Sequence, residues 1–157
     1  MNPEAVIGIR RAEPDETELL AGLVDITAAS FDLPHWRRQS AVPGSFTYVM
    51  EQKSIFGFVS AGSAELLDES IGEVFGLWLN PEFRRQGLGR KLLVRGLSVL
   101  KRRGNTIAHV YLTPDNRPAE LLLASLDFLQ MNQTRQLNQG DTSISQIGYQ
   151  LDLKDYF

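Results

Sequence analysis

Strand patterns and helical patterns alternate along this chain in an order that limits the folds it can adopt. Runs of β-branched and aromatic residues predict strands, and apolar residues at every third or fourth position predict helices. In sequence order we expect a strand, a helix, three strands, a helix, a strand, a helix and two strands, which is typical of a mixed α/β sheet with helices packed on it. The expected strands are Val6–Arg10, Phe46–Glu51, Ile55–Ala61, Ile71–Leu79, Thr106–Leu112, Gln130–Leu137 and Ser145–Leu153.

Local signals set the expected helix boundaries. Asp15 followed by Glu18 suits a capping box, so the first helix is expected from Asp15 to about Phe31. Pro34 disfavours helical dihedrals in the preceding residue, so Leu33–Gly44 is expected to be a loop or a short irregular helix. The other two helices are expected from about Gly87 to a stop at Gly104, and from Pro118 to about Leu126.

Size and composition indicate one globular domain spanning residues 1–157. Apolar residues make up 43% of the chain and charged residues 22%. No apolar run approaches the roughly 18 residues of a membrane span, and the amino terminus lacks the pattern of a signal peptide. We therefore expect a cytoplasmic protein without a membrane partner. The chain has no cysteine, which excludes disulfides and thiolate nucleophiles, and its two histidines argue against a metal site.

The net charge of −3 hides a basic block. The first 32 residues are mainly acidic, whereas the segment from Glu82 to Arg103 holds a single acid and half of the sixteen basic residues. A local basic block on an acidic protein suggests one anionic ligand and no nucleic-acid track. The alternative is a solvated helix face. The basic residues of the block are Arg84, Arg85, Arg90, Lys91, Arg95, Lys101, Arg102 and Arg103.

The segment Asn80–Lys91 lies between an expected strand and a long expected helix. The N–H groups at a helix start, with the positive end of the macrodipole behind them, hold phosphate oxygens well. Gly87 and Gly89 lack a Cβ, so oxygens can approach the main chain closely. The segment lacks the Gly-Lys-Ser/Thr of a P-loop, and Leu92 stands where a Rossmann fingerprint needs its third glycine.

This segment resembles the signature of the GNAT superfamily of acetyl-CoA-dependent N-acetyltransferases. The signature is a proline after a strand, then Arg/Gln-x-x-Gly-x-Gly/Ala opening a helix. The chain matches it with Pro81 and Arg84–Gly89, and a looser second motif with Asn116, Ala119, Leu122-Leu123 and Asp127-Phe128. The order of elements matches across nearly the whole chain. The resemblance implies a central, mostly antiparallel sheet of six or seven strands flanked by about three to four helices.

The resemblance also implies where acetyl-CoA binds. Backbone groups of Leu77, Trp78 and Leu79 would contact the pantetheine arm, and Asn116 would contact the cofactor from the next strand end. Asn116 has an alternative role as a turn residue that caps the following helix. The pyrophosphate would bind the loop residues Arg84, Arg85, Gln86, Gly87, Leu88, Gly89 and Arg90.

The resemblance places a candidate general base at Glu73, since several family branches use a glutamate on the strand before the loop. The alternatives for Glu73 are an edge residue facing solvent and a buried salt bridge. Leu123 stands where the family usually has a proton-donating tyrosine, and Tyr111 stands where the branch that acetylates protein N-termini has a glutamate. Tyr111 is therefore a candidate proton donor, with simple packing as the alternative.

Three further aromatic residues need an assignment. His109 is expected to be structural. His35 and Trp36 lie where family members build the wall of the acceptor site, and packing beneath the loop is the alternative for Trp36.

The resemblance implies transfer of acetyl from acetyl-CoA to a primary amine by direct attack in a ternary complex. The competing hypothesis, suggested by Leu123, is a catalytically silent acyl-CoA sensor, and a more distant one is an interaction domain without CoA affinity. The acceptor is a small molecule or a peptide, with polyamines, amino acids, antibiotics and protein N-termini all open. The acidic N-terminal helix favours a cationic acceptor. The expected assembly is a monomer or a homodimer.

Overall fold

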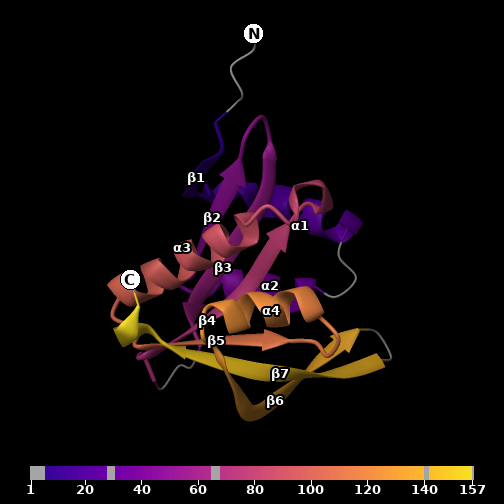
Figure 1. Cartoon of the computed structure of the whole chain (residues 1–157). Helices are drawn as coiled ribbons and strands as arrows, with labels where there is room; N and C mark the ends of the chain where they lie inside the picture. Colours follow the sequence, from indigo (N-terminus) through magenta and orange to yellow (C-terminus); the bar gives the residue numbers. More distant parts are fainter. Residues whose placement is uncertain (1–5, 28–30, 65–67, 140–141, 157) are drawn as a thin grey trace. The chain divides into compact units, whose positions relative to one another are not determined.

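The computed structural model describes residues 6–27, 31–64, 68–139 and 142–156, which contain seven strands and four α-helices (Figure 1). The helices are α1 Thr17–Thr27, α2 Leu33–Ser40, α3 Leu88–Arg102 and α4 Arg117–Ser125. Short 3₁₀ turns occupy Pro14–Glu16, Pro81–Phe83 and Leu153–Asp155. The strands are β1 Gly8–Arg11, β2 Phe46–Glu51, β3 Ile55–Ser63, β4 Ile71–Leu79, β5 Ile107–Leu112, β6 Leu129–Gln139 and β7 Thr142–Asp152. Among the described helices, none is long and apolar enough to cross a membrane.

The strands form one sheet in the order β1-β2-β3-β4-β5-β7-β6. β4 and β5 run parallel, with Glu73 beside His109. The pairs β1–β2, β2–β3, β5–β7 and β6–β7 are antiparallel. The predicted mixed fold, with a mostly antiparallel sheet of six or seven strands and three to four helices, is therefore confirmed.

Contacts among the described residues group into two compact units. The first comprises residues 1–62 and 74–96, and the second comprises residues 63–73 and 97–157. β4 and α3 each contribute residues to both units. The prediction that residues 1–157 act as one domain stays a prediction.

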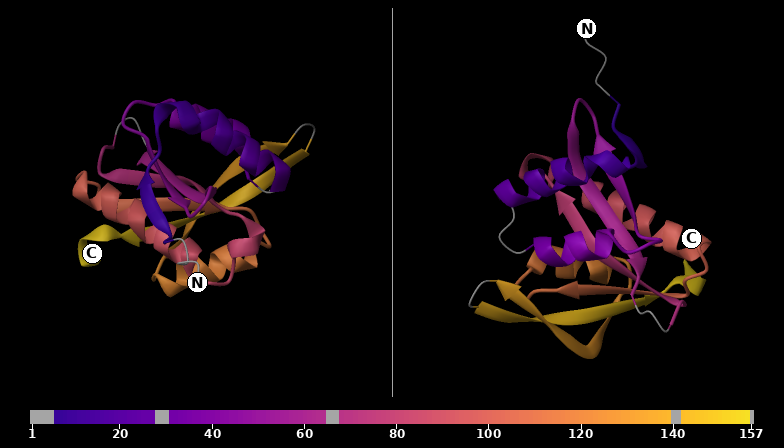
Figure 2. Two further views of the ribbon diagram at one scale, coloured as in Figure 1. Left: turned by 90° about the horizontal axis from the view of Figure 1, so that it is seen from above. Right: turned by 180° about the vertical axis from the view of Figure 1, so that it is seen from behind.

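In the first unit, alternate residues of β3 face different helices. Trp36 of α2 donates a hydrogen bond to Ser60 of β3 (2.9 Å). A side chain at Gly57 would instead come within 3.1 Å of Leu92 in α3, and one at Gly96 of α3 would come within 3.0 Å of Val59. This is the period-two alternation of a strand that is covered on both faces. Figure 2 shows α1 and α2 lying across β2 and β3 on one face.

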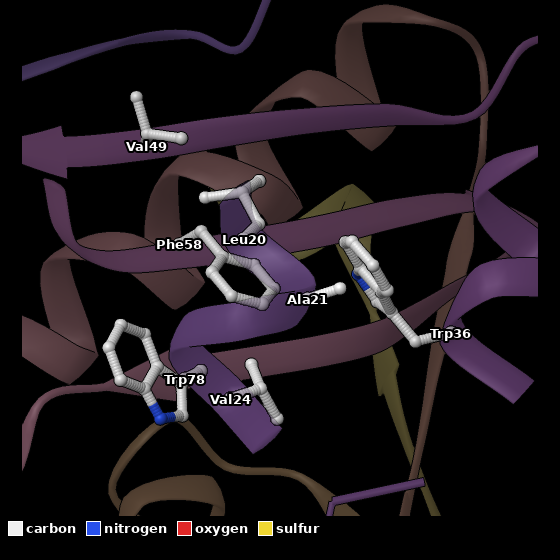
Figure 3. Packing of buried hydrophobic residues seen from close by; sticks show 7 residues of the cluster. All are labelled: Leu20, Ala21, Val24, Trp36, Val49, Phe58 and Trp78. Atoms are coloured by element: carbon white, nitrogen blue, oxygen red, sulfur yellow. The ribbon is translucent and has the colours of Figure 1, made fainter. Parts of the chain in front are cut away.

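The core of this unit is an aromatic and aliphatic cluster between α1, α2 and the strands (Figure 3). Trp36 is 1% exposed, and its ring centroid lies 5.5 Å from that of Phe58. Aromatic pairs at such distances stabilise a core beyond the apolar area they bury. The cluster comprises Leu20, Ala21, Val24, Trp36, Val49, Phe58 and Trp78.

α2 is a regular short helix in a segment that was expected to be a loop or an irregular helix. Its first turn contains Pro34, whose missing N–H would have no helical partner at that position. The side chain of Asp32 caps the helix by accepting a hydrogen bond from the N–H of His35 (3.0 Å). The proline therefore starts a helix here.

The start of α1 differs from the sequence prediction in its capping residues. The capping-box pair is Glu13 and Glu16, two positions earlier than the expected Asp15 and Glu18. The Glu16 carboxylate accepts a hydrogen bond from the N–H of Glu13 (2.7 Å). A 3₁₀ turn led by Pro14 precedes the α-helix and displaces its cap. The expected helix end at about Phe31 follows residues 28–30, which lie outside the described residues.

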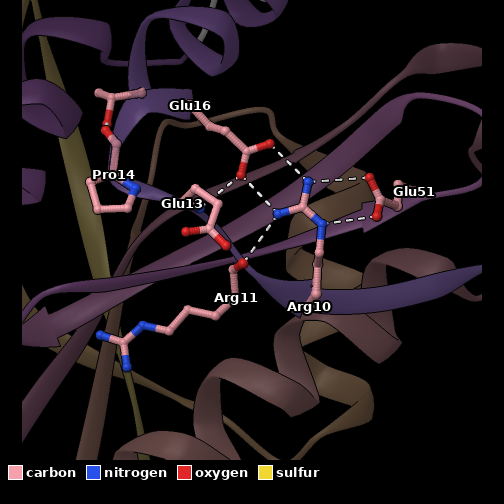
Figure 4. A network of polar contacts seen from close by, with 7 residues as sticks. Arg10, Arg11, Glu13, Pro14, Glu16 and Glu51 are labelled. Carbon is pink, nitrogen blue, oxygen red and sulfur yellow. Dashed lines mark hydrogen bonds and ion pairs between the residues drawn. The ribbon is translucent and has the colours of Figure 1, made fainter.

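Arg10 joins β1 to the start of α1 and to β2 (Figure 4). It contacts the carboxylate of Glu16 at 2.8 Å and that of Glu51 at 2.8 Å. The hydrogen bonds from Arg10 and from the Glu13 backbone lower the pKa of Glu16 to about 2. Glu18 of α1 is paired with Arg37 of α2 at 2.6 Å. Part of the acidic charge at the amino terminus is therefore neutralised by neighbouring arginines.

The second unit is built on β5, β7 and β6. The pairing of β6 with β7 shifts register between Gln130 and Thr134, and Figure 1 shows β6 bending there. Gly148 of β7 makes room for this bend, since a side chain there would meet the Met131 side chain and come within 3.2 Å of the Gln133 carbonyl. Beyond the bend, Arg135 pairs with Gln146. The bend thus sets where the side chains of β6 point.

Candidate functional site

The segment between β4 and α3 is anchored where it leaves the sheet. The N–H of Asn80 donates to the carbonyl of Phe56 in β3 (2.8 Å), and the Asn80 side chain accepts from the N–H of Glu82 (3.0 Å). Phe83 stacks on Phe56 with ring centroids 4.0 Å apart. These contacts, all within the first unit, fix the point from which the following turn begins.

The turn that follows uses two residues in the left-handed conformation. Arg85 has φ 66° and Gly87 has φ 77°. The left-handed conformation costs a non-glycine residue about 1 kcal/mol, and such strain clusters at functional sites. Before them, extended Arg84 donates from Nε to the carbonyl of Leu79 (3.0 Å). Left-handed residues in a turn aim successive N–H groups into one concavity, which suits an anion.

The space beside the two glycines is open. A Cβ atom at Gly87 or Gly89 would have no protein atom within 4 Å. α3 begins at Leu88, and the first N–H groups of a helix have no partner inside it. Residues Arg84–Arg90, called the glycine loop below, therefore offer open space, the N–H groups of a helix start and positive charge to one ligand. The exposed basic side chains are Arg84, Arg85, Arg90 and Lys91.

A second polar group lies in the second unit, across β4 to β7. Glu73 is 7% exposed, and its two carboxylate oxygens contact Nη1 and Nη2 of Arg135 at 3.0 and 2.9 Å. Nε of Arg135 donates to Gln146 (3.1 Å), and the guanidinium carbon lies 4.0 Å from the centre of the Tyr111 ring. We call Glu73, Tyr111, Arg135 and Gln146 the arginine cluster. Glu73 is thus the buried salt bridge that the sequence allowed as an alternative.

Strand register explains how distant residues meet in the arginine cluster. Glu73 lies beside His109 in the parallel β4–β5 pair, and Tyr111 follows two residues later on the same face of β5. Gly148 stands opposite Tyr111 on β7, and Gln146 comes two residues before it. Cross-strand neighbours on one face are close enough to interact.

The sequence pattern of the acetyltransferase (GNAT) family matches residues 12–128. The chain belongs to the GNAT acetyltransferase family. The matched region includes the glycine loop, Glu73 and Tyr111 but ends before Arg135 and Gln146.

Curated relatives of this GNAT chain are longer than it is. The mycothiol acetyltransferase of Actinosynnema mirum is 32% identical over 140 residues, covering 80% of this chain and 45% of the relative. The uncharacterized N-acetyltransferase YuaI of Bacillus subtilis is 34% identical over 82 residues, covering 52% of this chain and 47% of the relative. The matched regions therefore span less than half the length of these two relatives.

Solved structures share the GNAT fold at low identity. The yncA protein of Salmonella typhimurium, solved with its cofactor acetyl-CoA, has a TM-score of 0.76 at 19% identity and covers 98% of this chain and 97% of its own. The ribosomal-protein-S18-alanine N-acetyltransferase of Escherichia coli has a TM-score of 0.75 at 19% identity, covering 94% of each chain. At these identities the likeness concerns the fold.

Two residues at the end of β4 already contact other parts of this GNAT chain. Trp78 is 3% exposed and packs in the core of the first unit. The carbonyl of Leu79 already accepts the hydrogen bond from Arg84, so a ligand would share it or displace that side chain. The role of Leu77, Trp78 and Leu79 in binding the pantetheine arm stays a prediction.

Asn116 occupies the cap position of α4. Its side-chain oxygen accepts a hydrogen bond from the N–H of Ala119 (3.4 Å), as the alternative role required. Asp115, just before it, has φ 70°. The side-chain amide donors of Asn116 are separate from this bond, so a cofactor contact stays a prediction alongside the cap.

Tyr111, the candidate proton donor, has different surroundings from Leu123 and His109. Leu123 is 3% exposed and lies in the core of the second unit. The Tyr111 hydroxyl donates to Gln133 (3.2 Å), and its ring carries the guanidinium of Arg135. His109 is 8% exposed, and its ring centroid lies 6.5 Å from that of Tyr111. The structure therefore gives Tyr111 a polar setting that simple packing does not require.

Trp36 is a packing residue, which decides between its two expected roles. Its indole is buried against Phe58 and donates to Ser60, as expected of a residue that packs beneath the loop. Sequence reasoning missed Arg135 and Gln146. The one available signal was Glu73 itself, because a buried carboxylate needs a cation and Arg135 stands on a predicted strand.

Proposed function

We propose that this chain transfers an acetyl group from acetyl-CoA to a primary amine by direct attack in a ternary complex. The observation that carries the proposal is the glycine loop: a strained turn and two open glycines at the start of α3, in a member of an acetyltransferase family. The N–H groups of Arg85–Arg90 would hold the pyrophosphate, with Arg84 adding charge. Leu77–Leu79 and Asn116 would contact the rest of the cofactor.

The reaction needs a proton acceptor and a proton donor. The amine nitrogen attacks the thioester carbon, the carbon–sulfur bond breaks, and its electron pair leaves with the sulfur. We propose Glu73 as the acceptor of the amine proton, directly or through water, and Tyr111 as a donor to the thiolate. The chain has no cysteine that could carry an acetyl-thioester intermediate.

The second candidate function is a catalytically silent acyl-CoA sensor. Two observations favour it: Leu123 is buried at the usual position of the donor tyrosine, and Glu73 is engaged by Arg135. Thiol release from acetyl-CoA, measured with polyamines, amino acids, aminoglycosides and peptides, separates the two functions. Release with at least one amine supports the enzyme. Binding of acetyl-CoA with no release from any amine supports the sensor.

The proposal also covers the oligomeric state, the cellular location and the number of domains. We propose one acetyltransferase domain, acting as a monomer or a homodimer in the cytoplasm. Light scattering would report the mass. A single calorimetric transition, with equal calorimetric and van't Hoff enthalpies, would support one cooperative domain.

A further inference from the structure

Arg135 is held in a fixed orientation from three sides. Glu73 contacts both terminal nitrogens, Gln146 accepts from Nε, and the ring of Tyr111 lies beneath the guanidinium plane. These partners come from three other strands of the second unit. A guanidinium fixed in this way loses little conformational freedom when it binds a planar anion.

The contrast with Arg10 shows that Arg135 is not simply a structural cross-link. A guanidinium has five N–H donors. Arg10 directs all of them at Glu16, Glu51 and the carbonyl of Arg11. Arg135 directs three of them at Glu73 and Gln146, so among the described residues two of its donors have no acceptor. Its side chain is 30% exposed, so part of it is open to solvent and to a ligand.

The charges of the cluster also limit what it can bind. Glu73 and Arg135 place a negative and a positive group side by side, with no net charge. A polycation gains little from such a pair, and at the amino terminus Glu16 and Glu18 are already paired with arginines. A ligand that carries an ammonium beside a carboxylate presents the complementary pair of charges.

We propose that the acceptor is an amine bearing a nearby carboxylate, as in an amino acid, and that Arg135 binds this carboxylate through its two remaining donors. This inference rests on the proposed function and names its substrate class. The acceptor ammonium would lie toward Glu73, which takes its proton before the amine nitrogen forms a bond to the acetyl carbon. The nitrogen releases its second proton to solvent as the carbon–sulfur bond breaks, the departing sulfur takes a proton from Tyr111, and the products are an N-acetylated acid and the CoA thiol. The expectation of a cationic acceptor, drawn from the acidic amino terminus, is replaced by this one.

The direct test observes Arg135 in the intact chain. The Nε–H resonance of Arg135 would be followed by ¹⁵N NMR in the presence of CoA, with acetate as the carboxylate probe and acetamide as its neutral isostere. Assignment comes from Arg135→Lys, which lacks the resonance. We expect a saturable shift with acetate and none with acetamide. Equal responses to both, or no response to either, would overturn the proposal.

Turnover gives a second, separate readout. Each of the twenty amino acids would be compared with its carboxamide in the thiol-release assay. We expect the acids to be preferred by at least tenfold in kcat/KM, and Arg135→Gln to remove that preference while CoA affinity stays unchanged. Arg117→Gln, which breaks an exposed pair with Glu120, is the matched control and should change neither. If carboxamides are acetylated as fast as the acids, the proposal that Arg135 binds the acceptor carboxylate is wrong.

The two readouts separate this inference from the proposed function. An acetate response without thiol release from any amine means that the carboxylate site exists and that acetyl transfer fails. Thiol release without an acetate response or a preference for acids means that the chain transfers acetyl groups and that Arg135 does not bind the acceptor carboxylate.

Discussion

The glycine loop and the arginine cluster are made of different parts of the protein. The loop is a continuous segment whose proposed role depends on backbone N–H groups and on the absence of side chains at Gly87 and Gly89. The cluster is made of side chains from four strands, with Glu73 and Arg135 separated by 62 positions in the sequence. A backbone site is set by local conformation, whereas a side-chain site depends on register and on the bend in β6. The first can be recognised from a motif, and the second needs the fold.

The largest expected effect of a substitution in the arginine cluster is at Glu73. Replacing Glu73 with Gln removes the proposed proton acceptor, and loss of a general base typically costs about 10²–10⁴-fold in rate. We expect a loss of about 100-fold at pH 7 with unchanged CoA affinity. The defect should shrink as pH rises, because the amine then loses its proton unaided.

Glu18→Gln is the matched control for this substitution, since it removes an exposed carboxylate from a pair with Arg37. It should leave the rate unchanged. A Glu73→Gln variant as active as the parent at pH 7 would show that Glu73 serves only to orient Arg135.

A smaller effect is expected at Tyr111. Tyr111→Phe keeps the ring beneath Arg135 and removes the hydroxyl that donates to Gln133. If the hydroxyl protonates the leaving thiolate, turnover should fall by about tenfold, a modest loss because a thiol with a pKa of about 8.5 leaves readily near neutrality. A silent substitution would assign the proton to water. In that case Leu123→Tyr is the variant in which turnover should rise.

Much of the fold, and the loop in particular, could be predicted from the sequence. β4 was predicted at its observed bounds because it is a continuous apolar run. Apart from its glycines, Glu73 is the one residue that interrupts that run. α2 was expected only as a loop or a short irregular helix because Pro34 was taken as a barrier to helix, although a proline in the first turn leaves no helical N–H unpaired. Arg135 could not be predicted, since its partners depend on a register shift between Gln130 and Thr134 that no local pattern reveals.

The smallest expected effect concerns the arginine network of the first unit, which resembles the arginine cluster in chemistry and differs in role. Because its hydrogen bonds hold the pKa of Glu16 near 2 instead of 4.5, Glu16 stabilises the fold above about pH 4.5. That stabilisation is lost as the pH falls toward 2. Glu16→Gln should cost about 1–2 kcal/mol at pH 7, since solvent screens the partly exposed pair.

Denaturant unfolding of parent and Glu16→Gln across that pH range measures the effect. The difference between them should shrink toward the acid end, and acetyl transfer at pH 7 should be unchanged. A loss of activity without a loss of stability would place this network in the site and remove the contrast with the arginine cluster.

The central claim, that the glycine loop binds acetyl-CoA, is tested most directly by calorimetric titration of acetyl-CoA into the parent and into Gly89→Glu. The new carboxylate would enter the open space beside Gly89 and repel the pyrophosphate, and a Cβ atom there would have no atom within 4 Å beyond the neighbouring backbone. Gly22→Glu, at an exposed glycine of α1 with equally open surroundings, is the matched control. We predict binding by the parent and by Gly22→Glu, and an affinity at least 100-fold weaker for a folded Gly89→Glu. Undiminished binding by folded Gly89→Glu would contradict the account.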